Sequence, residues 1–326
     1  MMHGTWIFWL IFNVFVLAML ALDLGVFHRE KHVVGVREAI GWTAAWVGLA
    51  GLFAVLIYFF GHTMVGEPTR ANSQLTLEFI TGYIIEQSLS VDNLFVFLLI
   101  FRYFKVPQEN QHVVLFWGVI GALVMRAIFI ATGVTLLNRF HWIVYIFGAI
   151  LIYSGVKLLR QHGADIHPEK NPLLRAFRKI FRMTENYEGR KFFVRRDALT
   201  FATPLALVLI VVETTDLLFA VDSIPAVLAV TREPFIVYTS NVFAILGLRS
   251  LFFALAGMLE RFHLLHYGLS IILIFIGSKM LAADYVDIPT ALALGIVGTI
   301  LAGSLLLSLV FPKKQPSTSQ DRRAHV

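Results

Sequence analysis

The strongest constraint on this chain is a series of long stretches without Asp, Glu, Lys or Arg. They cover residues 39–66, 110–125, 140–156, 198–212, 234–248, 262–278 and 288–312. Such runs suit an apolar helix that crosses the hydrocarbon core of a bilayer. The short alternating segments of a transmembrane β-barrel do not recur. The sequence therefore predicts an all-α fold, a polytopic membrane helix bundle.

Composition narrows the chemistry that such a bundle can perform. The chain has no Cys, which excludes disulfides and thiolate metal sites and leaves oxygen or imidazole ligands for any ion. It also lacks a P-loop, a His-Glu-x-x-His motif and a Gly-x-Ser-x-Gly motif. We therefore expect neither an enzyme nor an ATP-driven pump, and no permanently bound cofactor.

We predict nine spans, and the loop charges orient them. The spans lie at about 6–27, 40–60, 76–101, 112–137, 141–159, 200–230, 235–258, 263–283 and 288–311. With the N-terminus outside, twenty loop Lys and Arg residues fall on the cytoplasmic side, against only Arg70, Arg139 and Arg232 outside. The positive-inside rule thus predicts an inner-membrane protein with a cytoplasmic C-terminus. The basic charge reports topology and does not point to nucleic acid.

The predicted spans and the loops between them divide the chain into six regions. No Lys or Arg precedes the first span and no small-residue cleavage site is evident, so we expect it to be retained. The regions are 1–75 (accessory spans), 76–159 (repeat A), 160–199 (basic cytoplasmic loop), 200–283 (repeat B), 284–311 (last span) and 312–326 (disordered tail).

The basic loop 160–199 carries an amphipathic pattern. Leu174, Phe177 and Phe181 recur at helical spacing, with Arg and Lys at the other positions. The pattern predicts a helix lying on the anionic cytoplasmic leaflet of the bilayer. The alternative is a docking site for another protein.

An internal repeat relates spans 3–5 to spans 6–8. The nine residues from Leu137 match those from Leu259, and the eight from Ile150 match those from Ile272, at a constant offset of 122. Further back, Arg126 falls opposite Arg249. A three-span unit repeated in tandem enters the membrane from opposite sides, which predicts an inverted repeat of the kind found in secondary transporters.

Five acids lie inside two corresponding spans. Glu86 and Asp92 are in span 3, and Glu213, Asp216 and Asp222 are in span 6. At about 2.5–3.5 kcal/mol each, five ionised acids would cost well over 10 kcal/mol. The intramembrane bases Arg126, Arg249 and Lys279 are candidate charge partners, and pairing that only holds the helices together is one interpretation. Because the acids outnumber the bases, a bound cation is the other.

The available ligands favour a hard divalent cation. Several carboxylates with nearby oxygens suit Mn²⁺, Mg²⁺ or Ca²⁺, and ligand chemistry does not choose among them. A regular helix would point Asp222 away from Glu213. Because Pro225 removes a backbone hydrogen bond and span 6 is long, we expect a helix break that turns Asp222 inward. The candidate supporting ligands are Ser90, Asn93, Thr214, Ser223 and Asn241.

Two stretches, Ile80–Asn93 and Val212–Ala226, resemble signature segments of the TerC family, closest to its Alx-like branch. The resemblance extends over about 6–311. It implies a multi-pass protein of a family named for tellurium resistance, and in this branch it implies manganese export from the cytoplasm. The acidic motif positions of the family fall on the five acids named above. Other members are tied to membrane-protein insertion or to metal supply for secreted enzymes.

The leading interpretation is therefore a secondary transporter that exports Mn²⁺ through a carboxylate site between inverted repeats, with protons as a candidate counter-ion. The alternative is an insertion, assembly or metallation factor that acts through the loop 160–199 without transport of its own. Deleting that loop separates them, because transport should survive the deletion and docking should not.

Overall fold

The computed structural model describes residues 5–27, 35–160, 172–196, 199–255, 264–286 and 288–311. The predicted tail 312–326 lies outside these residues. The helices and strands are α1 (Thr5–Phe27), α2 (Val36–Val65), α3 (Asn72–Tyr103), α4 (Gln108–Arg139), α5 (Ile143–Arg160), α6 (Pro172–Ile180), β1 (Arg182–Met183), β2 (Phe193–Arg196), β3 (Leu199–Ala202), α7 (Pro204–Leu228), α8 (Pro234–Leu246), α9 (Leu248–Leu255), α10 (Leu265–Leu281) and α11 (Thr290–Val310).

Long apolar helices dominate the fold, as predicted. Within the described residues, eight segments are long and apolar enough to cross a membrane, and α10 is a shorter apolar helix. One of the eight consists of α8 and α9, which are separated at Gly247. The protein is therefore a polytopic helical membrane protein, and its seventh predicted span is made of two helices.

The break predicted in span 6 is wrong. Helix α7 runs without interruption from Pro204 to Leu228 and contains Pro225. The proline lies in the last turn, where its own carbonyl accepts a hydrogen bond from the Ala229 N–H at 2.9 Å. The predicted span was too long for a different reason. It included residues 199–202, which form strand β3 and not helix. The discontinuity of this half lies in the next span, at Gly247.

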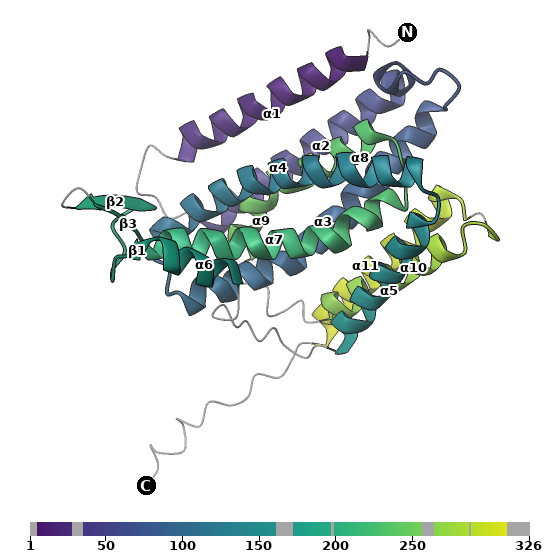
Figure 1. Cartoon of the computed structure of the whole chain (residues 1–326). Helices are drawn as coiled ribbons and strands as arrows, with labels where there is room; N and C mark the ends of the chain where they lie inside the picture. Colours follow the sequence, from purple (N-terminus) through teal and green to yellow (C-terminus); the bar gives the residue numbers. More distant parts are fainter. Residues whose placement is uncertain are drawn as a thin grey trace.

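The buried core is apolar and rich in aromatic rings. Where α1, α2, α3 and α8 meet, Phe12, Phe53, Phe79 and Phe243 pack ring against ring. Many large apolar side chains of α1, α2 and α11 are exposed instead, among them Leu17, Phe59 and Leu306. Exposed apolar faces of this extent are what a surrounding bilayer requires. Figure 1 shows α1 running along the outside of the bundle.

A small domain, here called the cap (residues 172–196 and 199–203), covers one end of the bundle. In it β3 pairs with β1 in parallel and with β2 in antiparallel register. The strands are a local exception to the predicted all-α fold. Leu174 and Phe177 of α6 pack into the same apolar cluster as Leu205 and Val208 of α7. Part of the apolar face of the predicted surface helix therefore packs into the protein's own core, and not into the bilayer.

Helices α5, α10 and α11 lie side by side, next to the larger group formed by α3, α4, α7 and α8 (Figure 1). Helices α5 and α10 approach to backbone contact. A Cβ on Gly148 would lie 2.9 Å from the carbonyl oxygen of Gly277, and one on Gly155 would lie 2.8 Å from that of Ser270. The partner moves seven residues back along α10 as the contact moves seven residues forward along α5, so the two helices are antiparallel.

Candidate functional site

A buried guanidinium is the centre of the candidate site. Arg126 of α4 forms an ion pair with Glu86 of α3, and its Nη2 lies 3.9 Å from Oδ1 of Asp216 on α7. Its Nη1 donates hydrogen bonds to Asn241 Oδ1 of α8 at 2.8 Å and to Ser223 Oγ of α7 at 3.3 Å. Side chains from both predicted repeats therefore meet at one cation. We call these five residues the central cluster.

The central cluster is closed off from the surface and incompletely satisfied. Glu86 is 0% exposed, Arg126 2% and Asp216 5%. Three of its buried atoms have no hydrogen-bond partner, namely Glu86 Oε2, Asp216 Oδ2 and Arg126 Nε. An unpartnered buried carboxylate oxygen is costly. Two such oxygens, on carboxylates that face the same guanidinium, leave lone pairs available to a ligand.

The structure gathers only part of the predicted supporting ligands. Ser90 Oγ lies 3.4 Å from Glu86 Oε1, and Ser223 and Asn241 both contact Arg126. Asn93 is buried on α3. Thr214 donates its hydroxyl to the Ile210 carbonyl of its own helix at 2.6 Å, so its proton is already committed.

Glu213 and Asp92 lie outside the central cluster. Glu213 is one turn before Asp216, and the two carboxylates act on each other electrostatically. It points at α4, where a Cβ on Gly121 would overlap its carboxylate. Asp92 is on α3, partly exposed, and no hydrogen bond or ion pair joins it to another described residue.

Asp222 is not turned inward as predicted. Because α7 stays regular through this region, Asp222 faces α5, where its Oδ1 accepts a hydrogen bond from Ser154 Oγ at 2.5 Å. The charge of Lys157, also on α5, acts on it from nearby. Asp222 therefore links α7 to the α5–α10 pair. Within the described residues, no three His, Asp or Glu side chains form a ready metal-binding group. The predicted cage of five carboxylates is thus not assembled in this structure.

Of the other predicted charge partners, Arg249 is buried on α9 and has contacts of its own. Lys279 lies at the end of α10 and lines a cavity at the end of the bundle opposite the cap. This open cavity of about 890 Å³ is also lined by Arg70, Glu78 and Glu233.

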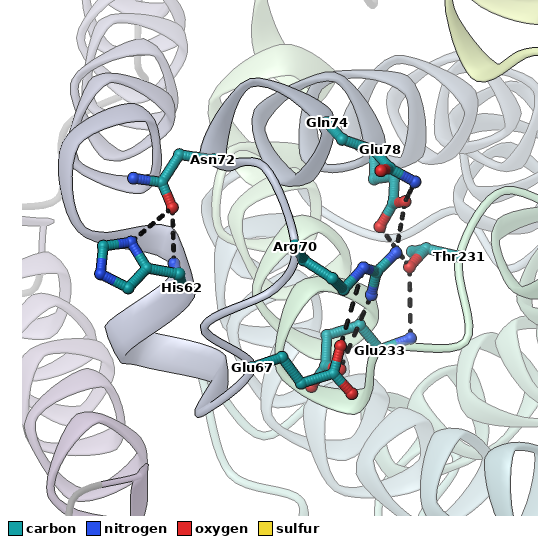
Figure 2. Close-up of polar contacts among 8 residues, drawn as sticks. All are labelled: His62, Glu67, Arg70, Asn72, Gln74, Glu78, Thr231 and Glu233. Carbon is teal, nitrogen blue, oxygen red and sulfur yellow. Dashed lines mark hydrogen bonds and ion pairs between the residues drawn. The ribbon is translucent and has the colours of Figure 1, made fainter.

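Sequence reasoning missed the polar cluster in the wall of that cavity, here called the latch (Figure 2). Arg70, in the α2–α3 connection, reaches Glu78 Oε1 of α3 at 2.6 Å and Glu233 Oε2, just before α8, at 3.8 Å. Glu78 is 2% exposed and also accepts hydrogen bonds from Gln74 and Thr231. A glutamate inside a predicted span was the available signal, but Thr231 and Glu233, which complete the cluster, lie more than 150 residues away in the sequence.

The latch also perturbs one carboxylate outside the spans. Burial raises the pKa of Glu233, and the negative charges of Glu67 and Glu78 act in the same direction. The opposing influences are Arg70 and the backbone N–H of Phe235. Glu233 therefore binds a proton more readily in the folded protein than an ordinary glutamate does.

Fold and site together define a multi-pass helical membrane protein with a charged cluster buried between its helices. The chain belongs to the TerC family of integral membrane proteins, whose profile matches residues 71–316. No solved structure gives a significant match.

Similar proteins extend over nearly the whole chain. A membrane protein of Myxococcus xanthus, STKORF319, is 49% identical over 314 residues, which are 96% of this chain and 95% of that protein. The protein Alx of Escherichia coli K12, named as a membrane-bound redox modulator, is 47% identical over 306 residues, 94% of this chain and 95% of its own. A membrane protein of Rickettsia bellii is 41% identical over 302 residues, 93% of this chain and 97% of its own.

Proposed function

We propose that this protein is a secondary transporter that exports a hard divalent cation, foremost Mn²⁺, from the cytoplasm. The observation that carries the proposal is the pair of unpartnered, fully buried oxygens Glu86 Oε2 and Asp216 Oδ2. They come from α3 and α7, one from each predicted repeat. Carboxylate oxygens are the ligands that Mn²⁺, Mg²⁺ and Ca²⁺ prefer. The preference for Mn²⁺ comes from the resemblance to the Alx-like branch.

The α5–α10 crossing supports a two-sided mechanism. At the sequence offset of 122, Gly148 corresponds to Ser270 and Gly155 to Gly277. Exchanging the repeats therefore converts the Gly148–Gly277 contact into the Gly155–Ser270 contact, and both are present. A two-fold relation between three-helix units would produce this pattern. Inverted units of this kind allow a central site to open to either side. The positive-inside charge distribution supports an inner-membrane location with the cap in the cytoplasm.

The proposal includes no catalytic step and no redox step by this chain. The name of the Alx relatives refers to redox, but a chain without Cys cannot carry out thiol–disulfide exchange. Control of cytoplasmic Mn²⁺ is a route by which a transporter would affect redox balance indirectly.

The decisive experiment is Mn²⁺ flux into proteoliposomes that contain purified protein and a trapped pH dye. We expect flux in the wild type and its loss in Glu86→Gln and Asp216→Asn, because each variant removes one carboxylate charge from the central cluster. Glu109→Gln is the matched control, since this exposed glutamate begins α4. Alkalinisation of the vesicle lumen linked to Mn²⁺ entry identifies proton exchange, because protons then leave as Mn²⁺ enters. Undiminished flux in both cluster variants refutes the site.

One observation favours the second candidate, an assembly or metallation factor. The cap presents the exposed basic residues Arg178, Lys179 and Arg182. Reversing Arg178 and Lys179 to Glu should leave Mn²⁺ flux intact if the protein is a transporter. The assembly role would be supported if the wild type shows no flux but captures a partner, and the variant with Glu at positions 178 and 179 loses that capture. Because Leu174 is buried in the core, these substitutions replace the deletion of the loop as the test.

A further inference from the structure

The central cluster already contains a cation, and that cation is part of the chain. Arg126 occupies the space between Glu86 and Asp216, where the proposed substrate would need the same carboxylates. A divalent ion and a guanidinium cannot both contact these oxygens closely without strong repulsion. Binding of the metal therefore requires Arg126 to give up part of its contact with the pair.

Arg126 has other acceptors to which it can shift. The Nη1 that pairs with Glu86 also donates to the neutral oxygens of Asn241 and Ser223, at 2.8 and 3.3 Å. Its link to Asp216 is longer, at 3.9 Å. The guanidinium can thus loosen its hold on both carboxylates and keep its hydrogen bonds to Asn241 and Ser223. This arrangement of acceptors allows Arg126 to exchange its carboxylate partners for neutral ones, as well as to stay paired with the carboxylates.

The charge balance gives this exchange a function. Without Arg126 and without metal, two bare carboxylates would lie inside the bilayer, which is strongly unfavourable. With Arg126 in place, the empty cluster holds a single net negative charge. With a divalent ion on the carboxylates, their charge is balanced by the metal, and the cluster holds a single net positive charge on the guanidinium, which keeps its hydrogen bonds to Asn241 and Ser223.

We propose that Arg126 is a tethered counter-ion that occupies the Glu86–Asp216 pair when the metal is absent and withdraws when the metal binds. This inference rests on the proposed transport function and concerns the return step. The empty protein changes the side to which it opens with Arg126 in the place of the cargo. Net export then does not require another ion to accompany the empty carrier.

Two modes of transport separate this role from a structural one. In exchange, Mn²⁺ on one side of the vesicle swaps with radioactive Mn²⁺ on the other, and the carrier always moves loaded. In net flux the carrier returns empty. For Arg126→Gln we expect exchange to persist while the ratio of net flux to exchange falls roughly tenfold or more, because the empty cluster has lost its counter-charge. Arg126→Lys keeps the charge and should keep a ratio near that of the wild type.

Binding gives a second readout with an unusual sign. Removal of a competing cation should tighten Mn²⁺ binding by Arg126→Gln, roughly tenfold, and Mn²⁺ should raise its Tm more than that of the wild type. Glu86→Gln should weaken binding instead. A merely structural role for Arg126 predicts weaker Mn²⁺ binding in Arg126→Gln as well as in Glu86→Gln. The control is Arg139→Gln, which removes an exposed arginine from the end of the same helix.

The outcomes distinguish the two levels of the proposal. A wild type that shows neither exchange nor net flux refutes the transport function itself. A functional wild type with an unchanged ratio and unchanged or weaker Mn²⁺ binding in Arg126→Gln refutes the tethered counter-ion and leaves transport standing. Should Arg126→Gln not fold, Arg126→Lys still tests the tethered counter-ion. This variant keeps the positive charge, so loss of its net flux with exchange retained would refute the proposal by showing that Arg126 supplies something other than charge.

Discussion

Glu86 and Arg126 form an ion pair in which neither side chain reaches the surface, at 0% and 2% exposure. A pair this deeply buried has given up its hydration entirely, and its mutual attraction must offset that loss. Its two members come from adjacent helices, α3 and α4, and its neighbours Asp216 and Asn241 come from α7 and α8. The pair therefore joins helices of both predicted repeats at the same point.

The two members of this pair should be coupled in their contribution to stability. We expect Glu86→Ala to lower the free energy of unfolding by about 3–5 kcal/mol, because Arg126 loses its closest counter-charge. Glu86→Gln combined with Arg126→Gln should cost less than the sum of the single changes. Unfolding in detergent, measured by intrinsic fluorescence for the wild type, Glu86→Ala, the two single Gln variants and the double variant, tests this. Strict additivity would show that the pair is not coupled.

The α5–α10 crossing should not tolerate a larger residue. Gly277→Val places atoms against the Gly148 carbonyl, 2.7 Å from the position of the new Cβ, so the helices must separate. We expect a loss of about 1–3 kcal/mol or more, visible as a lower Tm. Gly295→Val on α11 is the control, because nothing lies within 4 Å of a Cβ built there. Equal Tm values for the two variants would contradict the crossing.

Ionisation of Glu233, in the latch, should make the thermal stability of the protein depend on pH. Because its pKa is raised in the folded protein, the folded state binds the proton more tightly than the unfolded state does. Stability from this group is present at low pH and is lost as the pH rises from the ordinary glutamate range through the raised pKa. We expect Glu233→Gln to raise Tm relative to the wild type at pH 8 but not at pH 4. A benefit confined to pH 4 would reverse the sign and refute the argument.

The hydrogen bond between Ser154 and Asp222 should stabilise the contact between α5 and α7. Ser154→Ala removes the donor and leaves a partly buried carboxylate, so we expect a loss of about 1.5–3 kcal/mol. The control is Thr135→Ala, which removes an exposed hydroxyl bonded to its own helix. Unfolding measurements as above check both. An equal effect of the two changes would mean that the link between the helices carries no energy.

The sequence was sufficient to locate the membrane spans, but not the break at Gly247 inside one of them, and it was only partly sufficient for the site. Charge-free runs set the spans because a bilayer accepts little else. Helical periodicity placed Asp222 opposite Glu213, and the structure agrees; the error was to let Pro225 override a regular helix. The convergence of Asp216 with Glu86 could be inferred from matching spans. The latch could not, because Arg70 and Thr231 are brought together by packing between segments far apart in sequence.

The close approach of α5 and α10 also restricts how the bundle can deform. Backbone lies against backbone at Gly148 and Gly155, with the branched side chains of Ile152, Ile274 and Leu281 packed beside these contacts, and Ser304 of α11 packs closely against Gly268 of α10. These three helices can then shift only as one rigid block. Any rocking of the block against the rest of the protein has to be accommodated at its seam with α3, α4 and α7. On the α7 side of that seam, the Asp222–Ser154 hydrogen bond would serve as the pivot or be the first contact to part.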